Sequence, residues 1–147
     1  MNSISRWVTL VALAALVCSC ANDVLDATYA TRSVAAAAGA IERGWIPSWI
    51  PPEAFALHEA HNVDTNESVL AFRLPAKLAW RPPGSCIAAD AGQFYEPGFT
   101  RSWIPETLDD YQFYSCPDPK TSGVPLLSAL AVSRDGQYVL HWRFVGP

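Results

Sequence analysis

Charged residues are scarce in this 147-residue chain, and basic residues are the scarcer kind. Only 16% of the residues are charged, and 10 basic residues stand against 14 acidic ones, for a formal net charge of −4. Residues 1–19 hold a single charged side chain, Arg6, so the remainder carries a net charge of −5. Binding to nucleic acid or to anionic lipid headgroups needs a basic patch that displaces counterions. This composition therefore argues against both as partners.

The chain also lacks a hydrophobic run long enough to cross a bilayer. Its longest apolar run, Trp7–Val17, is interrupted only by Thr9 and follows the basic Arg6. Eleven helical residues reach roughly 16 Å, about half the thickness of a hydrocarbon core. A short apolar run of this kind near an N-terminus is typical of the central region of an export signal, not of a transmembrane helix.

The end of this run resembles the lipobox of bacterial lipoproteins. The sequence Val17-Cys18-Ser19-Cys20 has an aliphatic residue three positions before a cysteine and a small residue directly before it. The resemblance implies that residues 1–19 are removed and that Cys20 receives a diacylglycerol and an acylated amine. Several acyl chains, at ~0.8 kcal/mol per buried methylene, anchor a protein stably where one chain does not. The alternative is an ordinary secretory signal with incidental cysteines, which we favour less.

The residues after Cys20 bear on which membrane would hold the anchor. Ala21 stands where an aspartate is the familiar inner-membrane retention signal of enteric bacteria. The sequence therefore predicts sorting to the outer membrane, although Asp23 leaves inner-membrane retention open.

Only two cysteines remain for the exported part of the chain, Cys86 and Cys116. An exported protein meets an oxidising compartment, so an even pair predicts one disulfide. Closing a loop of about 30 residues would contribute roughly 3.5 kcal/mol in the chain-entropy description. The alternative is a pair of free thiols. Neither cysteine has a second cysteine or a histidine at zinc-ligand spacing.

Proline and glycine are frequent, at 12 and 8 residues, which favours short elements joined by turns. After a tether at 20–30, an apolar spacing predicts a helix from Val34 to Arg43, capped by Thr31 or Ser33 and ended by Gly44. The three prolines of Gly44–Pro52 forbid a ladder strand, so this segment should cross the core as an extended strap.

Alternating residues and turn signals predict strands over the rest of the chain. They cover residues 55–63, 68–74, 111–116, 127–132 and 138–144, with Asp64-Thr65-Asn66-Glu67 and Asp135-Gly136 in hairpin turns. We expect an α+β domain over residues 31–147, with a small antiparallel sheet of about five strands, one N-terminal helix and one disulfide.

A set of short motifs is similar to an uncharacterised family of short proteobacterial lipoproteins, the YbbD-like proteins. The matching residues are Thr28-Tyr29-Ala30-Thr31, Gly44-Trp45-Ile46-Pro47, Pro51, Ala54, His61, Asp64-Thr65-Asn66 and Trp103-Ile104-Pro105. The resemblance spans most of residues 28–144. It implies a location and a fold but no activity, because the family has none assigned.

Candidate chemistry is weak throughout. His58-Glu59-Ala60-His61 invites comparison with the zinc-protease motif, but that motif places its histidines four apart on a helix. Here the histidines are three apart on an expected strand and would point to opposite faces, so we expect no metal and no cofactor. Glu59 and His61 share a face with Leu57 and should form a hydrogen-bonded pair. Asp64, in the adjoining turn, completes a weak candidate site.

Other side chains are equally ambiguous. Ser85, Ser115 and Ser133 offer hydroxyls, but none lies in a strand–turn–helix pattern that presents a nucleophile. Trp45, Trp49 and Trp103 are candidates for lining a ligand groove, because tryptophan is enriched at binding sites. Packing in the core is the interpretation that we favour for all three.

These observations predict a non-catalytic envelope lipoprotein that binds another envelope protein, either as an accessory or as a neutraliser of a toxin or enzyme. An acidic domain suits electrostatic steering toward a basic target. The alternative is a small envelope hydrolase that uses Glu59 and His61, which requires a pocket at that pair.

The lipobox interpretation makes a direct prediction for Cys20→Ala. The variant should remain an unprocessed, unacylated precursor, because the acyl acceptor sulfur is absent. Mass spectrometry of the chain made in a bacterial host measures this. A natural product with an unmodified sulfur at position 20 would contradict the interpretation.

Overall fold

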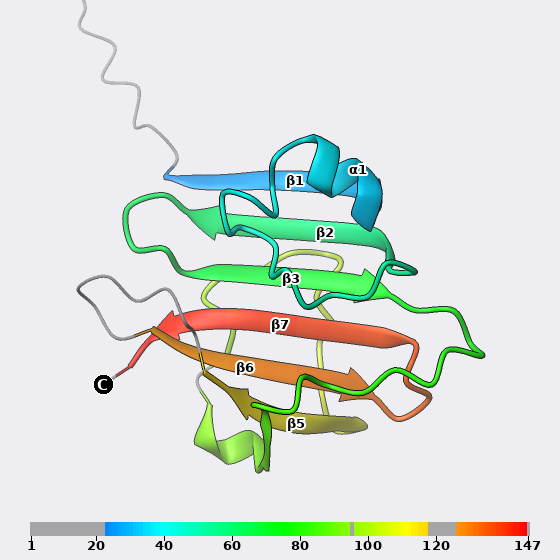
Figure 1. The fold of residues 1–147 in the computed structure, drawn as a ribbon. Coiled ribbons are helices and arrows are strands. Elements are labelled where there is room, and N and C mark those ends of the chain that lie inside the picture. The colour runs from blue at the N-terminus through cyan, green and yellow to red at the C-terminus, as the bar shows by residue number, and fades with distance from the viewer. Residues whose placement is uncertain (1–22, 95, 118–125, 147) are drawn as a thin grey trace, which may run out of the picture.

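A computed structural model describes residues 23–94, 96–117 and 126–146 of the chain. Its centre is one antiparallel sheet with the strand order β1-β2-β3-β7-β6-β5-β4 (Figure 1). The strands are β1 (Val24–Thr31), β2 (Phe55–Asn62), β3 (Ser68–Arg73), β4 (Ile87–Ala89), β5 (Tyr111–Cys116), β6 (Leu126–Ser133) and β7 (Tyr138–Val145). The helices are α1 (Arg32–Ala37) and the 3-10 turn η1 (Ala91–Gln93).

Both faces of the sheet are apolar, so both are covered. On one face, here called the strap face, Leu57, Leu70, Phe72, Leu130 and Val139 pack under the segment 44–54. On the opposite face, here called the loop face, Trp142, Phe144 and their neighbours pack under Phe94 and the segment 96–108. Figure 1 shows the first segment in front of the strands and the second behind them. The described part of the domain is therefore three layers with hardly any helix.

The expected fold class, α+β with about five strands and one helix of some ten residues, is wrong. The five predicted strands exist as β2, β3, β5, β6 and β7, but β1 and β4 extend the sheet to seven. Pairing of β1 with β2 joins segments about 30 residues apart. A single sequence does not reveal such a long-range pairing, because the ladder partner supplies the hydrogen bonds.

The tether predicted at 20–30 is also wrong from Val24 onward, because that segment is strand β1. β4 was missed for a different reason. It has only three residues and lies directly after Cys86, whose bond to Cys116 holds it against β5. The signal segment 1–19 and Cys20 lie outside the described residues.

The helix is shorter than predicted because Gly39, not Gly44, ends it. Thr31 caps its start, since Oγ1 accepts a hydrogen bond from the Val34 amide. At the end of the helix, Gly39 has a φ of +75°. Its amide donates a hydrogen bond to the Ala36 carbonyl, and the Ala40 amide donates one to the Ala35 carbonyl. This is the Schellman motif, which needs one residue in the left-handed conformation, and glycine adopts that conformation with the least steric strain. A Cβ at Gly39 would lie 2.7 Å from the Arg43 guanidinium.

The predicted disulfide is present between Cys86 and Cys116. It ties the segment that carries Leu78 and Trp80, which pack on the strap face, to the edge of the sheet. Among the described residues, no helix has the length and apolar character to cross a membrane.

Removing the disulfide should cost stability. In Cys86→Ser, the free energy of unfolding should fall by roughly 3.5 kcal/mol, because the unfolded chain regains the entropy of a 30-residue loop. Urea unfolding of the variant against the parent measures this, and a thiol reagent should then label Cys116. Full thiol labelling of the native parent protein would contradict the disulfide.

Candidate functional site

The strap face carries a row of polar side chains that crosses β2, β3, β7 and β6 near one end of these strands. Strand register places His61 opposite Ser68, Ser68 opposite Arg143, and Arg143 opposite Ser128. Glu59 and His141 lie two residues along their strands from His61 and Arg143, on the same face. Six polar groups thus share an otherwise apolar layer, and only Arg143 among them is more than marginally exposed.

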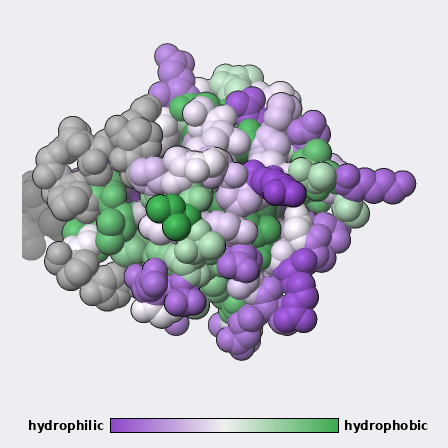
Figure 2. Space-filling view, turned by 60° about the horizontal axis from the view of Figure 1, so that its bottom comes forward, coloured by the Kyte–Doolittle hydropathy of each residue, from purple (hydrophilic) through white to green (hydrophobic). Residues whose placement is uncertain are grey.

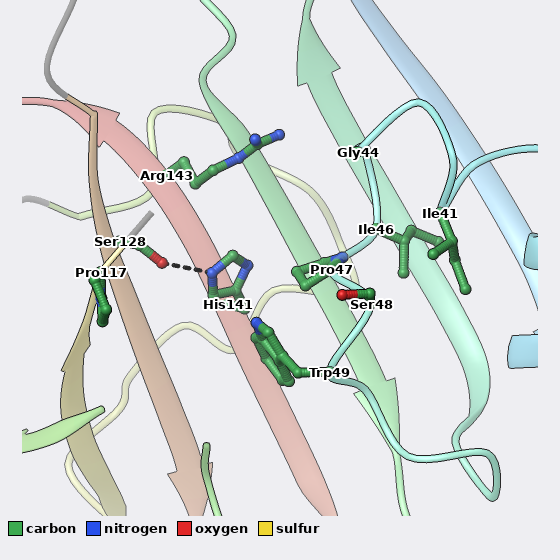
Figure 3. A pocket seen from close by; sticks show the side chains of 10 residues that line it. All are labelled: Ile41, Gly44, Ile46, Pro47, Ser48, Trp49, Pro117, Ser128, His141 and Arg143. Carbon is green, nitrogen blue, oxygen red and sulfur yellow. Dashed lines mark hydrogen bonds between the residues drawn. The ribbon is translucent and has the colours of Figure 1, made fainter. Parts of the chain in front are cut away.

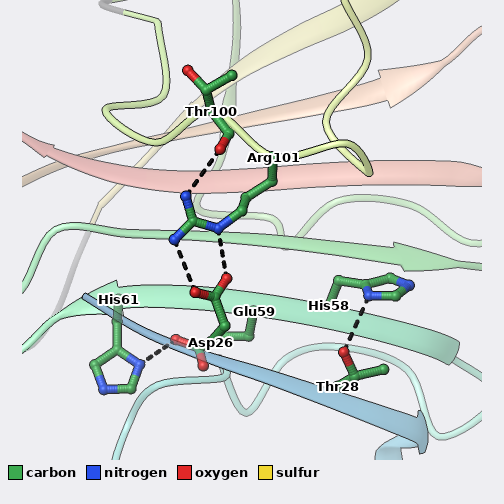
Figure 4. A network of polar contacts seen from close by, with 7 residues as sticks. All are labelled: Asp26, Thr28, His58, Glu59, His61, Thr100 and Arg101. Carbon is green, nitrogen blue, oxygen red and sulfur yellow. Dashed lines mark hydrogen bonds and ion pairs between the residues drawn. The ribbon is translucent and has the colours of Figure 1, made fainter. Parts of the chain in front are cut away.

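Glu59 and His61 form the hydrogen-bonded pair that the sequence predicts. Glu59 Oε1 lies 2.6 Å from His61 Nδ1, and the residues are 1% and 4% exposed. The Trp45 ring stacks on the His61 ring at 4.3 Å, and the Arg43 guanidinium lies over Trp45 (Figure 4 shows the pair itself). The strap therefore seals the pair from solvent.

Burial decides the protonation of this pair. Loss of hydration raises the pKa of the Glu59 carboxyl to about 8, although the nearby Arg143 opposes the shift. Burial, followed by the charges of Arg143 and Arg43, lowers the pKa of His61. Together these directions favour a neutral pair, in which the Glu59 hydroxyl donates to Nδ1. Glu59 Oε2 and His61 Nε2 have no hydrogen-bond partner in the described part of the chain.

A second histidine lies in the same layer and was not singled out from sequence. His141 Nε2 is 2.6 Å from Ser128 Oγ, and both residues are buried. Burial, reinforced by the Arg143 charge, lowers the pKa of His141 to about 3. At neutral pH this imidazole is uncharged and a weak base. In the sequence, His141 alternates with the apolar Leu140 and Trp142, which places it on the opposite face of the strand. This alternation did not reveal that the opposite face is buried as well.

Ser128 and His141 line a small cavity of about 120 Å³ between the strap and the sheet. Trp49, Pro47 and Ile46 of the strap form its opposite side (Figure 3). This volume holds a few water molecules or a ligand of similar size. Glu59 and His61 do not line it.

A wider groove of about 500 Å³ lies on the loop face. Its walls come from the start of β2, the end of β3, the loop 102–105 and the β6–β7 turn. Its lining includes Trp103 and Ser133, two residues that the sequence singled out, together with Arg73, Tyr111, Asp135 and Tyr138, which it did not. Glu59 and His61 are absent from this groove as well.

The remaining candidates are dispersed. Asp64 lies on the exposed β2–β3 turn, where its amide donates to Asn62 Oδ1 at 2.8 Å, and it does not join Glu59 and His61. Ser85 and Ser115 are exposed. Trp49 contacts the small cavity, whereas Trp45 covers His61. In the described residues, no group of three or more His, Cys, Asp or Glu is arranged to hold a metal ion.

On the loop face, an ion pair fastens the sheet edge. Arg101 Nε and Nη2 donate to the two carboxylate oxygens of Asp26 at 2.6 and 2.8 Å (Figure 4). The hydrogen bond from Arg101 lowers the pKa of Asp26, so Asp26 is ionised at neutral pH. Thr28 Oγ1, two residues along β1, is 3.3 Å from His58 Nδ1.

The neutral state of Glu59 predicts a pH dependence of stability. A carboxyl whose folded pKa is raised stabilises fully below its unfolded pKa of 4.5 and loses that contribution as pH rises through about 8. The parent should therefore lose stability as pH rises from 5 to 9. Glu59→Gln cannot titrate, so over this range its free energy of unfolding should rise relative to that of the parent by on the order of a few kcal/mol. Urea unfolding at several pH values measures the difference. Glu53→Gln, at an exposed glutamate, is the control and should follow the parent.

Comparison with known proteins gives one match. Residues 23–73 match the family model described as the YbbD head domain, which covers β1, α1, the strap, β2 and β3. No curated protein and no solved structure matches the chain. This match confirms the resemblance to the YbbD-like family over residues 23–73.

Proposed function

We propose that the protein is a lipoprotein of the cell envelope, anchored through Cys20, whose domain binds another envelope protein without catalysing a reaction. The observation that carries the binding role is the free edge of β1. This strand has eight residues and contains neither proline nor lysine, and among the described residues it pairs on one side only, with β2.

The hydrogen-bonding direction of each β1 residue follows from one contact. The Val63 amide donates to the Asp23 carbonyl at 2.8 Å, so position 23 bonds toward β2. Directions alternate along an antiparallel strand. Val24, Asp26 and Thr28 therefore present their amides and carbonyls to the free edge, whereas beyond the end of β1 the Arg32 amide donates to the Ala54 carbonyl on the β2 side. Natural proteins usually block such edges with lysine, proline or a covering segment, and an open one is a template for an added strand.

The position of the anchor supports a partner other than a second copy. Two copies joined through antiparallel β1 strands would send their N-termini in opposite directions along the ribbon. Only residues 21–23 separate Cys20 from β1, a reach of about 10 Å. Placing both anchors in one leaflet would then be difficult, whereas a different protein meets no such restriction.

The chemistry of the surface agrees with this proposal. Figure 2 shows the apolar side chains of one side in small groups between polar ones. An interface made by backbone hydrogen bonds along an edge does not need a broad apolar patch. The net charge of the chain, −4, suits a basic partner, whether an envelope component or an incoming toxin or enzyme.

The absence of catalysis is part of the proposal. A hydrolase that uses Glu59 and His61 would need a pocket at that pair, but neither residue lines the cavity or the groove. Ser128 Oγ and His141 Nε2 are close enough for the histidine to take a proton from the serine hydroxyl. With a pKa of about 3, however, His141 is far from the near-neutral value that suits a general base.

Thr28→Pro tests the proposal. The Thr28 amide points to the free edge, so proline there blocks strand addition without removing a bond to β2. The tagged parent should capture a stoichiometric partner from detergent-solubilised envelope, and Thr28→Pro should lose it. Thr28→Ala keeps the amide and is the matched control, which should capture normally.

Three results would contradict the proposal. They are the lack of any stoichiometric partner, equal capture by Thr28→Pro, and recovery of only a second copy of the chain. Circular dichroism of each variant checks that the sheet is retained.

A further inference from the structure

The groove on the loop face, here called the Trp103 groove, is built from segments far apart in the sequence. It is lined by Ala56 and His58 of β2, Arg73 of β3, residues 102–105, Tyr111 of β5 and residues around the β6–β7 turn. Its volume of about 500 Å³ lies within the range of sites for small molecules, 300–1,000 Å³. A protein interface would need a much larger area than such a hollow offers.

The walls of the groove are held in place by contacts to the sheet. The Tyr138 hydroxyl donates to the Trp103 carbonyl, and the Trp103 ring stacks on His58 at 5.7 Å. The loop is thereby fastened to both β7 and β2. On the facing side, Asp135 accepts hydrogen bonds from Ser133 Oγ at 2.6 Å and from the Gln137 amide at 3.0 Å. A ligand would therefore meet a largely preformed site.

The floor of the groove holds the only alanine among the described residues with a positive φ. Ala56 has a φ of 48° at the irregular start of the β2–β3 pairing, between Phe55 and His58. An L-residue other than asparagine or aspartate seldom adopts this conformation, and such strain is concentrated at ligand sites. This observation is independent of the side chains that line the walls.

The polar groups of the groove balance in charge. Hydrogen bonds, first from Ser133, lower the pKa of Asp135, so its carboxylate is ionised. The Arg73 guanidinium lies 5.4 Å from the centre of the Tyr138 ring. Burial raises the pKa of both Tyr111 and Tyr138, so their hydroxyls stay neutral. One cation and one anion beside aromatic rings suit a ligand without net charge.

We propose that the Trp103 groove binds a sugar ring of a neutral glycan. The C–H faces of a sugar pack against aromatic rings, here those of Trp103, Tyr111 and Tyr138. Sugar hydroxyls both donate and accept, so they can donate to Asp135 and accept from Arg73 and the Tyr111 hydroxyl. A purely apolar ligand would leave these groups unpaired, whereas a neutral polyol can hydrogen-bond to both.

Saturation-transfer NMR on the purified full chain, in a detergent that carries no sugar, tests the inference. The probes are maltotriose, cellotriose and N,N′,N″-triacetylchitotriose, all uncharged, at millimolar concentration. At least one should bind. Arg73→Met should weaken its binding by roughly tenfold, the usual consequence of losing a hydrogen bond to a charged group. Tyr111→Phe, which removes only a hydroxyl, should also weaken it and covers the case in which Arg73→Met does not fold.

Arg81→Met is the matched control, because Arg81 is an exposed arginine outside the groove, and its binding should equal that of the parent. Absence of binding by all three probes would overturn the inference. So would binding that survives Arg73→Met and Tyr111→Phe unchanged, or binding that Arg81→Met reduces equally. Loss of captured protein partner in Arg73→Met, without sugar binding, would assign the groove to a protein instead. The experiment needs neither the lipid anchor nor the β1 partner, so its failure is separable from failure of the proposed function.

Discussion

The structure depends on one constraint: a single sheet with two apolar faces must be covered on both sides, and the described residues contain almost no helix to do it. Trp142 and Phe72 point to opposite faces and are both buried. The covering layers are therefore irregular segments that carry aromatic side chains, Trp45 and Trp49 on one face and Phe94 and Trp103 on the other. Burial of large aromatic surfaces compensates for the missing regular hydrogen bonds.

The same constraint explains where the polar groups lie. A covering layer without regular structure leaves hollows, and these hollows are where Ser128, His141 and the residues around Trp103 meet. It also explains the perturbed groups. Glu59 and His61 are buried because the strap lies on them, and a hydrogen-bonded pair without charge is less costly than two charges in an apolar layer.

The sheet ends at two unlike edges. β4 is three residues long and is held by a disulfide, whereas β1 is eight residues long and has no outer partner in the part of the chain that the structure describes. An edge that is long, regular and without the usual blocking residues is unusual for a protein that remains alone. The proposed binding role and the proposed ligand of the groove would use two separate surfaces of the domain, one made by backbone groups and one by side chains.

The sequence by itself determined the elements whose signals are local. Five strands, the Asp-Gly hairpin, the cysteine pair and the Glu59–His61 contact were predictable, because alternation, turn residues and i, i+2 geometry act over a few positions. Only the tertiary structure decided the rest. Pairing of β1 with β2, burial of His141 and assembly of the Trp103 groove all require partners far along the chain, and one sequence carries no signal for which distant segments meet.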